Sequence, residues 1–115
     1  MISASTLQRL LAFRRERDWE QFHTFKNLAI SVSLEAAELL EHVQWTREAD
    51  AGSVVSSRHE EICNEIADIA IYLTYLAHDL GLDMDDCVRK KLALNEAKYP
   101  IDKSRGRSEK YDRFE

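Results

Sequence analysis

Two pairs of carboxylates stand at helical spacing within apolar segments of the chain. The stretch "EAAE" places Glu35 and Glu38 three residues apart, and "EIAD" does the same with Glu65 and Asp68. Three residues on a helix correspond to about 60° of arc, so each pair lies on one side of its helix, one turn apart. An unpaired charge is costly to bury, so carboxylates beside an apolar stripe need a partner. A cluster of carboxylate oxygens suits Mg²⁺, or alternatively Mn²⁺, better than zinc.

The two pairs can meet only if their helices pack against each other. Glu35 lines up with Leu39, and Glu65 lines up with Ile69 and Tyr72, so each pair borders the core-facing stripe of its helix. Antiparallel packing of the two helices would bring the four carboxylates together. Converging carboxylates repel one another and their pKa values rise unless a cation is present. We therefore expect a magnesium site formed by these four residues.

Two alternatives compete with this interpretation of the carboxylates. Acidic residues at this spacing occur by chance on many charged helices, where they are simply solvated. A di-iron carboxylate bundle would use similar ligands but needs an ExxH pair on two of its helices. His42 follows Glu38 by four residues rather than three, and "EIAD" contains no histidine. The sequence therefore favours oxygen-only ligation.

Hydrophobic periodicity predicts four helices that would position these carboxylates. The first covers residues 5–17 with Ser5 as N-cap, and the second runs from Thr24, its N-cap, to about Trp45. The third runs from Arg58 to Leu80, with Gly81 at its C-cap, and the fourth covers residues 84–98, with Asp83 as N-cap and Pro100 as its stop. Residues 46–57 are predicted to form a surface loop. We expect residues 1–100 to form one domain and residues 101–115 to form an extended tail.

The amino-acid composition limits which fold classes and which kinds of binding partner are expected. Only three Gly and one Pro in 115 residues leave little room for hairpins, so the chain is predicted to be all-α. The helices are too apolar for an isolated unit of this size, and we expect a four- to five-helix bundle completed by self-association. The formal net charge of −5 disfavours binding to a nucleic acid polymer.

The same features bear on localisation. No secretory signal pattern opens the chain, and no uncharged stretch is long enough to span a membrane. Cys63 and Cys87 lack CxxC spacing, so buried reduced thiols are favoured over a disulfide. A cytoplasmic protein without membrane contact is therefore expected.

The sequence as a whole resembles a known family. The "EAAE" stretch, 26 intervening residues and "EIAD" match the ExxE–spacer–ExxD pattern of MazG-like, all-α nucleoside triphosphate pyrophosphohydrolases. The stretches "RDWEQFH", "KNL", "LLEHVQW", "KYP" and "SRG" are similar to those of its dCTP pyrophosphatase branch. This similarity extends from Leu7 to about Tyr111.

The resemblance implies a Mg²⁺-dependent hydrolysis of a nucleoside triphosphate, with dCTP or a modified dCTP favoured, to the monophosphate and pyrophosphate. It implies a role in clearing unwanted nucleotides, and assembly as a dimer or homotetramer. Glu35, Glu38, Glu65 and Asp68 would hold the metal against the phosphates, and Glu38 or Glu41 would activate the attacking water.

Substrate contacts are also implied by the resemblance. A base and sugar pocket would contain Trp19, His23, Asn27, Trp45 and Tyr72, and triphosphate contacts would come from Lys26, Lys91, Asn95, Lys98 and Tyr99. The simpler interpretation makes the aromatic residues part of the core and the lysines of the fourth helix a solvated surface.

Two further alternatives concern specificity and function. Phe25 stands where relatives often carry Pro, which leaves dATP and dUTP open as substrates. A helical dimerisation or adaptor module that binds nucleotides without hydrolysing them is the main functional rival. A partner protein with an acidic docking surface is a third possibility.

Overall fold

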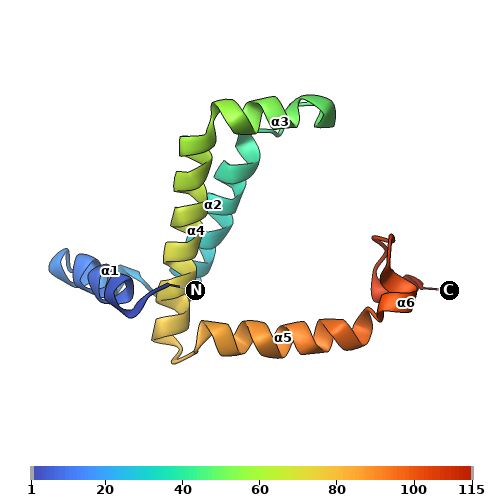
Figure 1. Cartoon of the computed structure of the whole chain (residues 1–115). Helices are drawn as coiled ribbons and strands as arrows, with labels where there is room; N and C mark the ends of the chain where they lie inside the picture. Colours follow the sequence, from blue (N-terminus) through green and yellow to red (C-terminus); the bar gives the residue numbers. More distant parts are fainter. Residues whose placement is uncertain (1, 115) are drawn as a thin grey trace. The chain divides into compact units, whose positions relative to one another are not determined.

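The computed structural model describes residues 2–114, which contain helices and no strand (Figure 1). The elements are α1 (Ala4–Glu16), η1 (Glu20–Phe22), α2 (Phe25–Glu41), α3 (Glu48–Ser57), α4 (His59–Asp79), α5 (Met84–Lys98), α6 (Ile101–Ser104) and η2 (Tyr111–Arg113). The predicted all-α class is confirmed. Within residues 2–114, no helix is long and apolar enough to cross a membrane. The chain falls into two compact units, residues 2–81 and residues 82–114.

Side-chain caps define where three of the long helices begin. Thr24 accepts a hydrogen bond from the backbone N–H of Asn27, and Asp83 accepts one from Asp86, as predicted for both positions. The prediction of Ser5 as the cap of α1 is wrong by two residues. Ser3 caps that helix instead, with its Oγ 3.2 Å from the backbone nitrogen of Thr6.

The segment predicted as a surface loop forms the helix α3, so this prediction is wrong. Glu48 and Asp50 lie in its first turn, where negative charge is favourable to the helix dipole, and Asp50 pairs with Arg47. Ser56 and Ser57 donate their hydroxyls to carbonyls of the preceding turn, which removes their competition with the helix. Gly and Ser have weak helix propensity, so an argument from propensity alone did not predict this helix.

Helices α2 and α4 pack side by side and antiparallel, with α3 joining their ends (Figure 1). Helix α2 ends at Glu41 rather than near Trp45, and a turn follows. Leu28, in the first turns of α2, is 1% exposed and is the most deeply buried large side chain among the described residues. This packing determines how the carboxylates of the two helices meet.

Substituting Leu28 by Ala tests the importance of that packing. Removal of the buried side chain should lower the free energy of unfolding by about 3 kcal/mol, because the apolar contacts are lost and a cavity remains. Urea unfolding followed by circular dichroism measures this change. Ser33, an exposed polar residue of the same helix, is the control, and an equal loss for Ser33→Ala would contradict the assigned burial.

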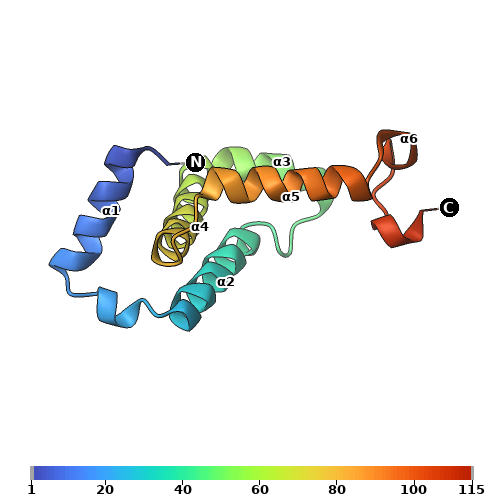
Figure 2. The same ribbon diagram turned by 90° about the horizontal axis from the view of Figure 1, so that it is seen from below.

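Helix α1 is attached to the C-terminal half of α4. The Tyr75 hydroxyl donates to the carbonyl oxygen of Leu10 at 2.7 Å, and Tyr75 is buried. The chain then turns through η1 before entering α2 (Figure 2). Residues from α1, η1 and α4 are therefore held together within the first unit.

The second unit contains α5 and the C-terminal segment. The segment expected to be an extended tail contains the short helices α6 and η2. Tyr99 packs edge-on against Tyr111 and Phe114, with ring centroids 6.0 and 5.7 Å away, and these contacts order the segment.

The two cysteines are free thiols, as expected. The expectation that both are buried is wrong, because Cys63 is exposed and Cys87 is partly buried.

Candidate functional site

The antiparallel packing of α2 on α4 brings the four predicted carboxylates into electrostatic contact. Burial, the neighbouring Glu38 carboxyl and the charges of Asp68 and Glu65 together raise the pKa of Glu35 to about 7. Burial contributes most to this shift, and the charges of Glu38, Asp68 and Glu65 add to it, since like charges disfavour one another's ionised form. The two pairs therefore influence each other electrostatically, and the metal site expected on them stays a prediction.

The surroundings of Glu35 also suit a cation. Its Oε2 atom is buried and has no hydrogen-bond partner among residues 2–114. A buried carboxylate oxygen without a partner is costly, and a hard divalent cation would satisfy it. No three His, Cys, Asp or Glu side chains of the described chain are preassembled as a closed ligand cluster. The donor set nevertheless consists of carboxylate oxygens, which fit Mg²⁺ or Mn²⁺.

His42, the C-cap of α2, is a site residue that the sequence argument did not assign. Its Nε2 contacts Oε2 of Glu65, and its Nδ1 lies 3.9 Å from Oε2 of Glu61. The side chain is largely buried, and Nδ1 has no hydrogen-bond partner in residues 2–114. His42 therefore holds one of the four carboxylates in place. The only sequence signal was its position one turn after Glu38.

A cavity of about 330 Å³ opens beside the carboxylates, entirely within the first unit. Three of the predicted pocket residues, Trp19, His23 and Tyr72, line it. The other lining residues are Leu10, Phe13, Asp68, Ile71 and Tyr75. Asp68 thus belongs both to the carboxylate cluster and to the cavity wall. The cavity is mostly apolar and aromatic with a few polar groups, as small-molecule sites commonly are.

A tight turn after α1 presents Trp19 and His23 to this cavity. Asp18 adopts a positive φ of 55°, a conformation that Asp tolerates because its short side chain can hydrogen-bond locally. Gln21 donates to both the side chain and the carbonyl of Asp18, which stabilises the turn. The ring of Trp19 packs edge-on against Phe13, with centroids 5.5 Å apart.

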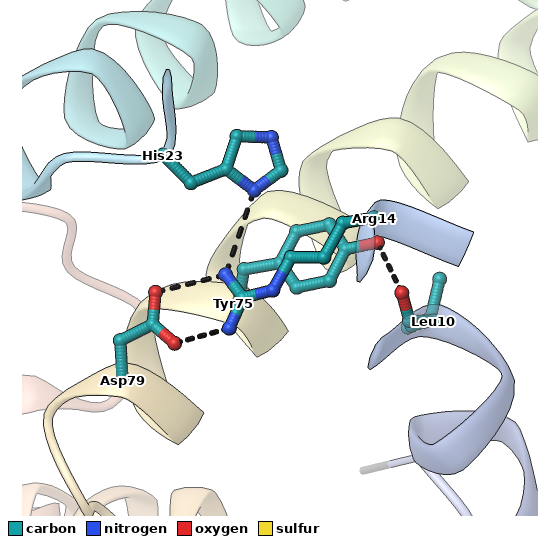
Figure 3. Close-up of polar contacts among 5 residues, drawn as sticks. All are labelled: Leu10, Arg14, His23, Tyr75 and Asp79. Carbon is teal, nitrogen blue, oxygen red and sulfur yellow. Dashed lines mark hydrogen bonds and ion pairs between the residues drawn. The ribbon is translucent and has the colours of Figure 1, made fainter. Parts of the chain in front are cut away.

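Behind His23 lies a cluster of polar groups that includes the buried Arg14 (Figure 3). Arg14 is only 6% exposed, and both of its terminal nitrogens donate to the Asp79 carboxylate, one of them at 2.9 Å. The Arg14 guanidinium lowers the pKa of Asp79, mainly through these hydrogen bonds. It also lies over the ring of Tyr75, 4.7 Å from its centroid. Neither Arg14 nor Asp79 was assigned a role from the sequence.

Other predicted substrate residues of the first unit do not line the cavity. Asn27 donates its side-chain amide to the carbonyl oxygen of Phe22, and Lys26 is exposed in the first turn of α2. Trp45 is 90% exposed in the turn after α2. Glu41 is exposed in the last turn of α2. Their predicted roles remain predictions.

The predicted phosphate residues of the fourth helix belong to the second unit. Lys91, Asn95 and Lys98 lie on α5, where Lys91 and Lys98 are exposed, and Tyr99 follows the helix. Lys98 places its ammonium over the ring of Tyr111, 4.9 Å from the centroid. Their contact with a triphosphate stays a prediction.

Comparisons with known proteins agree with these features. The model of the MazG-like family matches residues 30–114. Curated relatives include dCTP pyrophosphatase 1 of Bos taurus and of Homo sapiens, 39% and 37% identical over 101 residues. These alignments cover 86% of this chain in both cases, and 60% and 59% of the relatives. The chain thus spans about three fifths of the length of the curated relatives it matches.

A solved structure shows the same fold. The crystal structure of a pyrophosphatase from Archaeoglobus fulgidus matches with a TM-score of 0.81 and 43% sequence identity, over 84% of this chain and 90% of that one. Its all-α architecture confirms the predicted fold type. The family match covers most of the chain and includes both carboxylate pairs, and we conclude that the chain belongs to the MazG-like family.

Proposed function

We propose that the protein is a nucleoside triphosphate pyrophosphohydrolase that converts a deoxynucleoside triphosphate to the monophosphate and pyrophosphate. Water would attack the α-phosphorus, the bond between the α- and β-phosphates would break, and pyrophosphate would leave. The names of the curated relatives favour dCTP or a modified dCTP as substrate. Such an activity would serve to clear surplus or damaged nucleotides from the cytoplasm.

A single observation supports this proposal most strongly. Asp68 is both a member of the acidic cluster and a wall residue of the aromatic cavity. A nucleotide whose base lies between Trp19 and Tyr72 would therefore have its phosphates beside the carboxylates. Stacking on an aromatic face contributes roughly 1–3 kcal/mol per base.

The roles of the carboxylates follow from their surroundings. Glu35, Glu38, Glu65 and Asp68 would hold Mg²⁺, or alternatively Mn²⁺, and His42 would fix the orientation of Glu65. When bound, the cation would supply charge neutralisation for the phosphates and a Lewis acid at the reacting group. Glu38 is exposed to solvent at the edge of the cluster, which suits it, or Glu41 one turn on, to accept the proton of the attacking water.

Product analysis tests the reaction. The purified protein is incubated with Mg²⁺ and each common dNTP and NTP, and the products are separated by anion-exchange chromatography. Monophosphate with pyrophosphate supports the proposal, and the fastest substrate defines the base preference. Diphosphate with orthophosphate would show cleavage of the wrong bond. Binding without turnover would support the non-catalytic nucleotide-binding module instead.

Substituting Trp19 by Ala tests the cavity as the base site. Loss of a stacking surface should raise KM by about tenfold or more, with a smaller change in kcat, because the ring contacts the base and not the reacting phosphate. Steady-state kinetics with the best substrate measure this split. Phe22→Ala removes an exposed ring of the same segment that does not line the cavity, and it should leave KM unchanged. Equal effects of the two substitutions would contradict the assignment.

Self-association is part of the proposal. Among residues 2–114, only Leu28, Tyr75 and Ala77 are buried hydrophobic residues, too few to stabilise a chain of this length on its own. Large apolar side chains are exposed on α2 and α4, including Leu34, Leu40 and Ile66. We expect sedimentation equilibrium to show a dimer or a tetramer at micromolar concentration, and Leu34→Glu to weaken it. A monomeric wild-type protein would contradict this expectation.

A further inference from the structure

We propose that Arg14, clamped by Asp79, is a positioning residue that fixes His23 with its proton on Nε2, so that the cavity wall presents a hydrogen-bond donor to an acceptor atom of the bound base. The arrangement joins α1, the η1 turn and α4, all within the first unit (Figure 3). The inference concerns how the cavity recognises its ligand, and it rests on the proposed function only for the identity of that ligand.

The direction of the contact between Arg14 and His23 follows from their chemistry. Nη1 of Arg14 lies 3.5 Å from Nδ1 of His23. A guanidinium carries only donors and is not deprotonated in proteins. Nδ1 must therefore accept, which requires an unprotonated lone pair at that atom. In a neutral imidazole the proton then resides on Nε2.

The position of Arg14 is fixed independently of His23. Asp79 binds both of its terminal nitrogens, and the ring of Tyr75 lies against the guanidinium. Tyr75 is itself held by its hydrogen bond to the carbonyl of Leu10. Because Arg14 is almost fully buried, the donor that faces His23 has little freedom to turn away.

The charged groups around His23 favour its neutral form. Burial and then the Arg14 charge lower the pKa of His23, while Asp79 and Glu20 act in the opposite direction. The Tyr75 ring, 5.0 Å from that of His23, adds no charge at neutral pH. With Nδ1 engaged by Arg14, Nε2 is the remaining polar atom of a side chain that lines the cavity. A ligand there would meet a donor rather than an acceptor.

Nuclear magnetic resonance of the full chain without nucleotide tests the positioning role. Two-bond ¹H–¹⁵N spectra at pH 7.5, assigned with His23→Asn, should show His23 protonated on Nε2 alone. Arg14→Met should raise the pKa of His23, because it removes a positive charge beside the ring. Asp79→Asn should lower that pKa, because it removes the negative charge that offsets Arg14. Arg15→Met, an exposed neighbour in α1, should change neither the tautomer nor the pKa.

The opposite signs of the two pKa shifts distinguish a positioning role of Arg14 from a general role in stabilising the fold. A variant that only loosened the fold would move the pKa in one direction, towards the ordinary value for histidine. If either single variant is too unstable, the double variant Arg14→Met with Asp79→Asn leaves no buried unpaired charge, and its His23 should show a mixture of tautomers. A proton on Nδ1 in the wild-type protein, or shifts of equal sign, would overturn the proposal.

The ligand contact is tested by His23→Phe, which keeps a ring and removes the donor. KM for the best dNTP should rise up to about tenfold, the typical contribution of one hydrogen bond, with kcat nearly unchanged. An unchanged KM would overturn the contact with the base. Absence of turnover in the wild-type protein would instead refute the proposed hydrolase, while the resonance measurements would still decide the role of Arg14.

Discussion

Replacing Glu65 by Gln, or Asp68 by Asn, is expected to lower kcat for Mg²⁺-dependent hydrolysis by about 10³-fold or more. Each substitution removes one negative charge from the cluster formed by α2 and α4. Stabilisation of transition-state charge by a bound cation amounts to several kcal/mol, and each 1.36 kcal/mol is a factor of ten in rate. The amides are nearly isosteric with the acids, so the helical fold should be retained.

Steady-state product release at saturating Mg²⁺ and nucleotide measures the loss, and circular dichroism checks the fold. Glu60→Gln is the matched control, because Glu60 is an exposed acid in the first turn of the same helix. It should keep the wild-type rate. A folded Glu65→Gln or Asp68→Asn variant with full turnover would refute the assignment of these residues as metal ligands.

Much of this site could be predicted from the sequence because it depends on local periodicity. The caps at Thr24 and Asp83 and the spacing within each acidic pair are local properties of the helices that carry them. The convergence of Glu35 with Asp68 required only one further assumption, that α2 and α4 pack antiparallel. The aromatic residues Trp19 and Tyr72 followed from the family resemblance, and the structure places both on one cavity.

The contacts that the sequence could not predict join residues far apart in the chain. Arg14 and Asp79 are separated by 65 positions, and no periodicity connects an arginine of one helix with an aspartate of another. His42 was visible, but its contact with Glu65 depends on the packing angle of two helices. Helix α3 was missed for the opposite reason, since its Gly and Ser residues have weak helix propensity and local hydrogen bonds compensate for it.

The stability of the metal-free protein should fall as the pH rises from about 5 to 8, and Glu35 should be a main cause. Its pKa is about 7 in the folded protein and 4.5 ordinarily. Between these values the folded state binds more protons than the unfolded state, so the free energy of unfolding decreases with pH. The stabilisation that protonated Glu35 gives the folded state is fully present below pH 4.5, the pKa of this group in the unfolded chain. It is lost as the pH rises through about 7, the pKa of this group in the folded protein.

Glu35→Gln removes this dependence, because the amide stays neutral throughout. At pH 8 the metal-free variant should exceed the wild type in unfolding free energy by on the order of 3 kcal/mol, at 1.36 kcal/mol per pKa unit. At pH 4, below the ordinary pKa of Glu35, the two proteins should be nearly equal. Thermal unfolding in the presence of a chelator, at several pH values, measures the difference between the two curves, in which the titration of the groups that do not interact with Glu35 cancels.

The effect of Mg²⁺ completes the test, because a divalent cation binds the ionised form of the carboxylates that repel one another without it. Added Mg²⁺ should raise the Tm of the wild type at pH 8 more than at pH 5, and it should stabilise Glu35→Gln much less. Glu60→Gln should follow the wild type under all conditions. Parallel stability curves for the wild type and Glu35→Gln would mean that the four carboxylates do not form one interacting cluster in solution, and the magnesium site proposed on them would fall with it.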